Sequence, residues 1–358
     1  RDGFSGFGAN KKFATFPSLS LGWVVSEESF FKNQKWIDFL KLRASIGVNG
    51  NQGIGRYSSF SKMSNTGYVY NTTSIIGVYP SSLGNSDLGW ESTVSYNVGL
   101  DYIVLNHRIS GEMDLYKSKT TDVLVMRAIP GTTGYPSVWS NIGGVDNKGI
   151  ELGLTTVNID GTVRWETKFV FSLNRDKITK LYGGKNDKDI GNSWFVGEPI
   201  SAIYDYKAAG GVWTENELYS GKISVADFYP GQFRYADLNH DGQIDANNDR
   251  SIIGYGAPNY RCGINSSLTY KNISFSFFLN SIQGGNNYYI MNNYANVISS
   301  NLDIDDTYRR NTTAVRPYWT PDNGVTNSPG IYYDPKISGG VYEERSFVRI
   351  QDVSLNYR

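Results

Sequence analysis

Cysteine and histidine are nearly absent from this chain. Its 358 residues include one cysteine, Cys262, and two histidines, His107 and His240. A single cysteine excludes an internal disulfide framework. Neither histidine has a second histidine or a thiolate near it in the sequence, which argues against a transition-metal site and against histidine-based nucleophilic catalysis.

An excess of charge and long apolar runs are also missing. Lysine plus arginine and aspartate plus glutamate both number 34, so the net charge is +0 and no attraction to nucleic acid is expected. No run approaches the roughly 18 consecutive apolar residues of a membrane helix. The glycine clusters at 3–8 and 50–55 lead into neither a helical pattern nor a Lys-Ser or Lys-Thr pair, which argues against nucleotide binding.

Strict alternation of apolar and polar residues is the main feature that is present. Within 96–104 one face holds Tyr96, Val98, Leu100, Tyr102 and Val104, and Asn97, Gly99 and Asp101 fall on the other. A period of two with one apolar face predicts a strand. The pattern recurs at 40–48, 109–115, 150–154, 165–173, 262–270 and 273–279. Short turns at Asn106-His107, Asp160-Gly161 and Lys271-Asn272 predict hairpins.

The other connections are very long. Three connections are far longer than the roughly 15 residues above which an unstructured connection in a compact domain usually has a function. They run from Gly50 to Gly89, from Asp176 to Asn259 and from Gly284 to Arg345. Because they alternate with the tight turns, all of them leave the same edge of the sheet. Short turns at one end and long loops at the other are typical of transmembrane β-barrels, with the short turns on the periplasmic side.

Aromatic residues are enriched at 14%. Tyr102, Trp165 and Tyr270 each lie within a few residues of a short turn, which predicts an interfacial aromatic girdle. The alternative is that tyrosines, which have a high strand propensity, fill a β-rich core. The long connections also carry many rings, including Trp213 and Trp319. Such rings stack on sugars or grip peptide side chains, or they form small hydrophobic clusters that keep the loops ordered.

Several segments, taken in order, resemble one known family. They are RDGFSGFG (1–8), TFPSLSLGWVVSEESFF (15–31), LKLRASIGVNGNQGIG (40–55), SDLGWESTVSYNVGLDY (86–102), DLYKSKTTDVLV (114–125), NIGGVDNKGIELGL (141–154), PGQFRYADLNHDGQID (230–245) and SFVRIQDVSLNY (346–357). They resemble the SusC/RagA family of TonB-dependent outer-membrane transporters. The resemblance implies an all-β chain, with residues 1–358 forming about nine antiparallel strands in the C-terminal part of one 22-stranded barrel. The plug domain, the N-terminal strands and the final strands are expected to be absent.

The same resemblance implies a function in the bacterial outer membrane. The expected activity is import of a large nutrient, an oligosaccharide or a peptide, with a SusD-like surface lipoprotein as a lid and TonB as the energy source. A homodimer of transporter–lipoprotein pairs, surrounded by outer-membrane lipid, is expected as the assembly. No chemistry is performed on the cargo, so no catalytic residues are predicted.

The segment 237–249 resembles a calcium loop. Oxygen ligands recur at alternate positions, and Gly242 stands where such a loop turns sharply. The candidate ligands are Asp237, Asn239, Asp241, Gln243, Asp245 and Asp249. Position twelve, however, is Asn248, and the acid follows one residue later. A structural Ca²⁺ site is predicted, and a solvated polar turn without metal is the alternative.

Two other classes of protein stay open. One is a soluble, aromatic-rich β-sandwich or propeller that binds carbohydrate and uses the acidic loop as a structural calcium site. The other is a glycoside hydrolase whose paired carboxylates come from distant positions. In the barrel interpretation, polar side chains that point inward contact either the cargo or the plug. These are Arg43, Asn97, Asp101, Glu112, Glu151 and Asn265.

Overall fold

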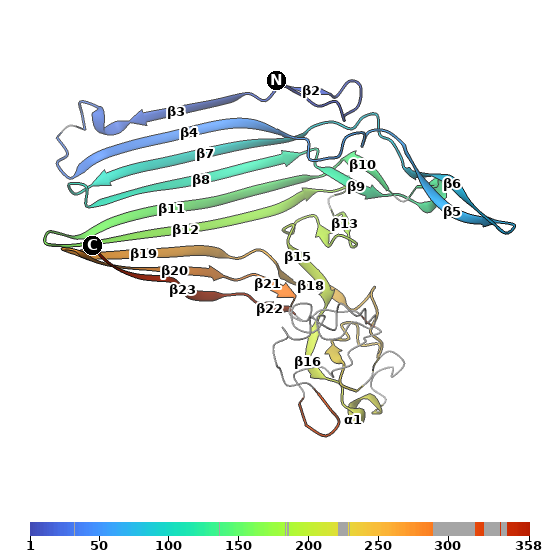
Figure 1. The fold of residues 1–358 in the computed structure, drawn as a ribbon. Coiled ribbons are helices and arrows are strands. Elements are labelled where there is room, and N and C mark those ends of the chain that lie inside the picture. Colours follow the sequence, from blue (N-terminus) through green and yellow to red (C-terminus); the bar gives the residue numbers. More distant parts are fainter. Residues whose placement is uncertain are drawn as a thin grey trace. The chain divides into compact units, whose positions relative to one another are not determined.

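The computed structural model describes residues 1–31, 33–135, 137–182, 184, 186–220, 228, 230–288, 319–325, 337 and 342–358 (Figure 1). The chain divides into two compact units, each treated separately below. The sheet unit comprises Arg1–Ile200, Tyr260–Ser281 and Val348–Arg358, and the loop unit comprises Ser201–Asn259 and Ile282–Phe347. Most of the predicted connection from Gly284 to Arg345 lies outside the described residues.

The sheet unit is built on one nine-stranded antiparallel sheet, which confirms the all-β class and the expected number of strands (Figure 1). In spatial order the strands are β23 (Phe347–Tyr357), β20 (Ile273–Gln283), β19 (Tyr260–Tyr270), β12 (Val163–Lys180), β11 (Gly144–Asp160), β8 (Ile109–Thr121), β7 (Glu91–Val104), β4 (Ile37–Asn51) and β3 (Ser18–Val24). From β3 to β20, each strand of this sheet pairs with the sheet strands that precede and follow it in the sequence. The sheet is therefore a meander, and its hairpins are those predicted from alternation.

The register between strands aligns the apolar faces. Leu100 pairs with Met113, Met113 with Leu152, and Leu152 with Phe171. Successive side chains of a strand point to opposite faces, so these residues form one apolar row across four strands. This face is open: Leu21 is 68% exposed and Val98 is 57% exposed.

That exposure disfavours the β-sandwich alternative, in which the apolar face would be covered by a second sheet. Within the described ranges, the remaining sheets are each two-stranded. Large apolar side chains exposed on one face of a long sheet instead match the lipid-facing side of a membrane barrel.

The three predicted hairpin connections at one end of the sheet are short, whereas the connection 25–36 from β3 to β4 at the same end is longer. Leu105–Arg108 joins β7 to β8, and Lys271–Asn272 joins β19 to β20. The turn between β11 and β12 is Gly161–Thr162, one residue later than the predicted Asp160-Gly161, because Asp160 still pairs with Arg164.

At the opposite end the long connections form small structures of their own. They include the hairpins β5 (Lys62–Tyr70) with β6 (Thr73–Ser82) and β9 (Leu124–Ala128) with β10 (Ser137–Asn141). The Asn141 amide exchanges two hydrogen bonds with the backbone of Gly89, which ties two connections together. The other short elements here are β1 (Asp2–Gly3), β2 (Phe13–Ala14), η2 (Gly131–Thr133), β13 (Lys188–Asp189) and β14 (Trp194–Phe195), whereas η1 (Val25–Glu27) follows β3 at the end of the short turns.

The loop unit has a hydrophobic core. Its elements are β15 (Ala202–Tyr206), β16 (Ala208–Val212), α1 (Glu215–Leu218), β17 (Phe233–Tyr235), β18 (Arg250–Tyr255), β21 (Asn286–Tyr288) and β22 (Tyr342–Glu344). The buried core consists of Tyr206, Val212, Leu218, Phe228, Phe233, Tyr235 and Ile244. Trp213 and Trp319 pack against it, so for these two loop rings the hydrophobic-cluster interpretation is confirmed. None of the helices among the described residues has the length and the apolar composition that a membrane-spanning helix requires.

Candidate functional site

The polar face of the nine-stranded sheet brings the predicted inward-pointing residues together. Register pairs Asp101 with Glu112, and Lys168 with Asn265. Alternation within each strand then places all six predicted residues on the face opposite the apolar rows. The prediction of a shared polar face is confirmed, and the register adds which of these residues are neighbours.

Arg43 forms the best-defined interaction on this face. From β4 it reaches across β7, where its Nε donates to Asp101 Oδ2 at 2.9 Å. Its Nη1 and Nη2 donate to the two carboxylate oxygens of Asp114 on β8, at 3.1 and 2.9 Å. A planar guanidinium that serves two carboxylates has a fixed geometry. Arg43 therefore ties three strands together and neutralises part of the local negative charge.

Gly99 makes room for this network. It lies opposite Arg43 on one side and opposite Asp114 on the other. A Cβ atom at this position would lie 2.6 Å from Arg43 Cζ and 2.7 Å from Asp114 Oδ1. Any side chain here would displace the guanidinium, so the glycine is required by close approach.

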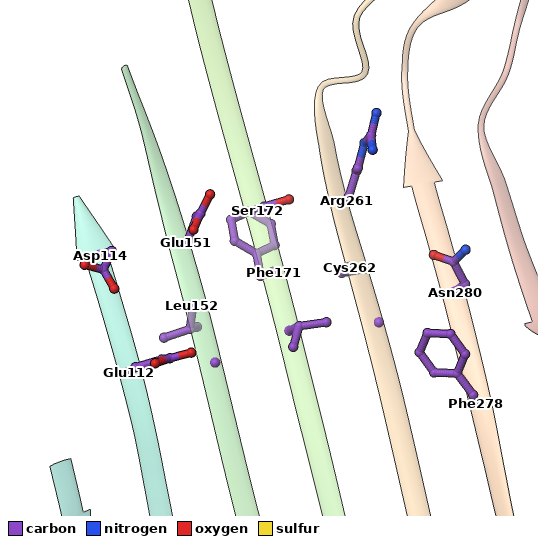
Figure 2. A pocket seen from close by; sticks show the side chains of 13 residues that line it. Glu112, Asp114, Glu151, Leu152, Phe171, Ser172, Arg261, Cys262, Phe278 and Asn280 are labelled. Carbon is purple, nitrogen blue, oxygen red and sulfur yellow. The ribbon is translucent and has the colours of Figure 1, made fainter. Parts of the chain in front are cut away.

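A shallow hollow opens on the same face, next to the Arg43 network (Figure 2). Carboxylates of Glu112, Asp114 and Glu151 line it from β8 and β11. Arg261 and Asn280 line it from β19 and β20, and Figure 2 shows these groups around one opening. The hollow therefore offers hydrogen-bond acceptors on one side and donors on the other, and Val170 and Phe278 add apolar surface to it.

The prediction from sequence did not include three residues that line the hollow, Asp114, Arg261 and Asn280. Alternation does place Asp114 on the polar face, two residues after Glu112, so a signal for that residue existed. Arg261 and Asn280 come from strands that are distant in the chain from β8. Only the pairing of β12 with β19 and of β19 with β20 brings them to the hollow.

The predicted calcium loop folds around its own backbone. Asp237 accepts from the N–H of Gly242 at 2.8 Å, and Asp241 accepts from the Asn239 amide at 2.8 Å. Asp249 is fully buried and accepts from the N–H groups of Leu238 and Asp245 at 2.7 and 2.8 Å.

Asp237, Asn239 and Asp241 gather at one turn of the loop. Asp249 accepts from Leu238 beside this turn and from Asp245, so its carboxylate joins the two halves of the loop. Gln243 is exposed. Among the described residues, no group of three or more His, Cys, Asp or Glu side chains has an arrangement that could hold a metal ion. The calcium site stays a prediction.

Comparison with known proteins identifies the family. The family described as "TonB dependent receptor-like, beta-barrel" matches residues 1–261. TonB-dependent receptor P39 of Formosa agariphila is 31% identical over 396 residues, which cover 100% of this chain and 37% of that protein. TonB-dependent receptor SusC of Bacteroides thetaiotaomicron is 34% identical over 335 residues, which cover 87% of this chain and 32% of SusC.

A solved structure agrees with the sequence relatives. The RagAB peptide importer in the "open-open" state superposes with a TM-score of 0.73 at 25% identity, over 99% of this chain and 37% of that chain. The chain thus spans little more than a third of the length of the proteins it matches. The family is one of receptors and transporters rather than enzymes. The chain belongs to the TonB-dependent receptor β-barrels, relatives of SusC that reside in the bacterial outer membrane.

Proposed function

We propose that this chain forms part of the wall of a plugged barrel that imports a large hydrophilic nutrient across the outer membrane. The observation that carries the proposal is the contrast between the two faces of the nine-stranded sheet. One face exposes apolar rows suited to lipid, and the other carries Arg43, Glu112, Glu151 and Arg261. A barrel with a polar interior and an apolar exterior is the architecture of an outer-membrane transporter.

The proposal also includes the domain organisation of the transporter. Residues 1–358 form the C-terminal part of one barrel domain, and a plug domain and further strands complete the transporter. Support comes from the relatives, which are much longer than this chain. Polar side chains of the inner face outside the hollow of Figure 2 hold the plug by hydrogen bonds in this arrangement.

The cargo is an oligosaccharide or a peptide. The hollow of Figure 2 presents carboxylates, a guanidinium and an amide, which are groups that bind hydroxyls and peptide units alike. The solved RagAB structures are those of a peptide importer, which supports the peptide side of this proposal. No hydrolysis is proposed, because import requires release of the cargo unchanged.

The partners are a SusD-like surface lipoprotein and TonB. The likeness to SusC and to RagAB supports both partners, and a homodimer of transporter–lipoprotein pairs is the proposed assembly. The lipoprotein closes the extracellular side, and TonB supplies energy from the periplasm.

Copurification tests this proposal. The native full-length protein is extracted from outer membranes in detergent, and bound proteins and small molecules are identified by mass spectrometry. We expect a lipoprotein together with a glycan or a set of peptides, and cells that lack the protein should not take up that cargo. Unimpaired uptake in such cells, or a full-length protein that is soluble without detergent, would overturn the proposal.

A further inference from the structure

A cluster of basic side chains occupies the outward face of β8, β11 and β12 at the end of the long connections. The residues of this basic patch are Lys117, Lys119, Lys148, Arg175 and Lys177, and all five are exposed. Lys117 lies directly opposite Lys148, and Lys148 lies opposite Arg175. In the next row, Asp146 lies between Lys119 and Lys177. One acid therefore stands among five cations.

The basic patch continues the apolar face, not the polar face of the hollow. On β8, Met113 and Leu115 precede Lys117 at intervals of two residues. On β12, Leu173 precedes Arg175 in the same way. The pairing of β8 with β7 and with β11 has no register shift over Ile109–Thr121. The alternation is thus unbroken, and the cations share the side of the sheet that faces lipid.

The height of the basic patch matches the border of the membrane. Arg175 lies ten residues after Trp165, which is close to a short turn. Ten residues span about 33 Å along a strand. At a tilt of about 40° this corresponds to about 25 Å across the bilayer, the height of the apolar band of an outer-membrane barrel. The long connections are on the extracellular side, so the cations lie at the headgroups of the outer leaflet.

The clustering of these cations is local. In the same rows, β7 carries Tyr96 and Val94, and β4 carries Ile46 and Val48. Among the described residues, no ion pair involves any of the four lysines of the patch. Like charges directly opposite each other destabilise a sheet. An anion that binds between them would remove this repulsion.

We propose that the basic patch binds the phosphate groups of lipopolysaccharide in the outer leaflet. Clusters of lysine and arginine beside a lipid-facing surface recognise anionic headgroups, and a lysine ammonium binds phosphate as a point charge. The acyl chains of such a lipid then lie along the apolar rows below, which include Leu115 and Leu173. The inference rests on the outer-membrane location of the chain and is independent of its cargo.

Lipid retention by the full-length protein tests this inference. Wild type and the variant K117Q/K148Q/K177Q are purified from outer membranes, and bound lipopolysaccharide is quantified by mass spectrometry. Each removed charge should weaken retention about fivefold. The control K41Q/K168Q/K188Q removes three exposed or partly exposed lysines from the polar face and a loop, and should retain wild-type lipid. K117R/K148R/K177R keeps the charge and should also retain it.

A second measurement identifies the source of the phosphate. Delipidated protein is titrated with lipid A, with dephosphorylated lipid A and with inorganic phosphate, and its melting temperature is followed. We expect a rise with lipid A only, and a smaller rise in K117Q/K148Q/K177Q. Equal rises with both lipids, a rise with inorganic phosphate alone, or equal lipid retention by the Gln variant and wild type would each overturn the inference. Loss of a bound protein from K117Q/K148Q/K177Q, with its bound lipid unchanged, would also overturn the inference.

Discussion

The nine-stranded sheet exposes large apolar side chains on one face, whereas the loop unit buries such side chains in a core. In the sheet unit, Leu21 and Val98 are mostly exposed. In the loop unit, Val212, Leu218 and Phe233 are buried in a compact core. Hydrophobic side chains avoid water, and a membrane sheet achieves this with lipid while a water-exposed loop must use its own side chains. Exposure of apolar residues therefore indicates the surrounding medium and not a defect of folding.

Removal of a core ring should have the largest effect, and only in the loop unit. Phe233→Ala creates a cavity at a buried position, which costs about 3–5 kcal/mol. Hydrogen exchange of the loop unit should accelerate while the amides of β11 and β12 stay protected. Tyr219→Ala, at a residue that is 75% exposed, is the control and should change little. Equal exchange in the two variants would contradict the assignment of an independent core.

A charge placed on the lipid side of the sheet should cost almost as much. Leu152→Arg lies in the middle of β11 on the apolar face, and an arginine at the bilayer midplane costs about 2–4 kcal/mol. Denaturant titration of the full-length protein in vesicles measures this loss. The control Val170→Arg introduces the same charge on the polar face and should stay within about 0.5 kcal/mol of wild type. A larger loss for Val170→Arg would reverse the assignment of the faces.

Calcium should stabilise the loop unit and leave the sheet unit unchanged. At about a hundred times its dissociation constant, bound Ca²⁺ adds about 2.7 kcal/mol to the free energy of unfolding. Asp241→Asn removes a charged candidate ligand and should abolish the effect, whereas Asp187→Asn, in a different turn, should not. Calorimetry with and without Ca²⁺ measures both. The polar-turn alternative is correct if the wild-type transition does not move.

Loss of the Arg43 network should have a smaller effect within the sheet unit. Arg43→Gln leaves Asp101 and Asp114 without their shared cation. Because these side chains are partly exposed, we expect a loss of about 1–2 kcal/mol, below the cost of breaking a fully buried pair. Lys41→Gln on the same strand is the control. Vesicle denaturation compares the two variants, and equal losses would show that the network adds no stability.

A pH dependence should appear in the segment that follows β12. Burial raises the pKa of Tyr182 to about 12, and the hydrogen bond that its hydroxyl donates to Asp189 adds to this rise. Burial also acts to raise the pKa of Asp189, but hydrogen bonds from Tyr182 and Asn192 outweigh it and hold this pKa below 3.8. The raised pKa of Tyr182 stabilises the folded state below pH 10, and this stabilisation is lost as pH rises towards 12. The lowered pKa of Asp189 stabilises the folded state above pH 3.8, and this stabilisation is lost as pH falls below 3.8.

The ultraviolet titration curve of Tyr182→Phe is subtracted from that of wild type, and the difference reports the ionisation of Tyr182 alone. We expect a midpoint near pH 12 in the difference curve. A midpoint near the ordinary tyrosine pKa of 10.0 would contradict the proposed contact.

Much of the sheet could be predicted from local sequence. Alternation at Tyr96–Val104 and its equivalents located the strands, because side chains of a strand must point to opposite faces. The small strands of the loop unit were not predicted. β16 and β17 are short and lie among irregular segments, so no alternation marks them.

The candidate site was predicted only in part. Six inward-pointing residues could be named, since the polar face of each strand is readable from its own sequence. Asp114 was not singled out, although it carries half of the Arg43 network. Its importance depends on its distance from a side chain 71 residues earlier in the chain.

Local sequence is enough to locate the strands, their two chemically different faces and the end of the sheet at which the long connections emerge. These properties follow from side-chain period and from the spacing of short turns, both of which are local. Tertiary structure decided which residues become neighbours: Arg43 with Asp114, Glu151 with Ser172 across β11 and β12, and Lys117 with Lys148. Such neighbours depend on strand order and register, which hydrogen bonds between distant segments establish only in the folded sheet.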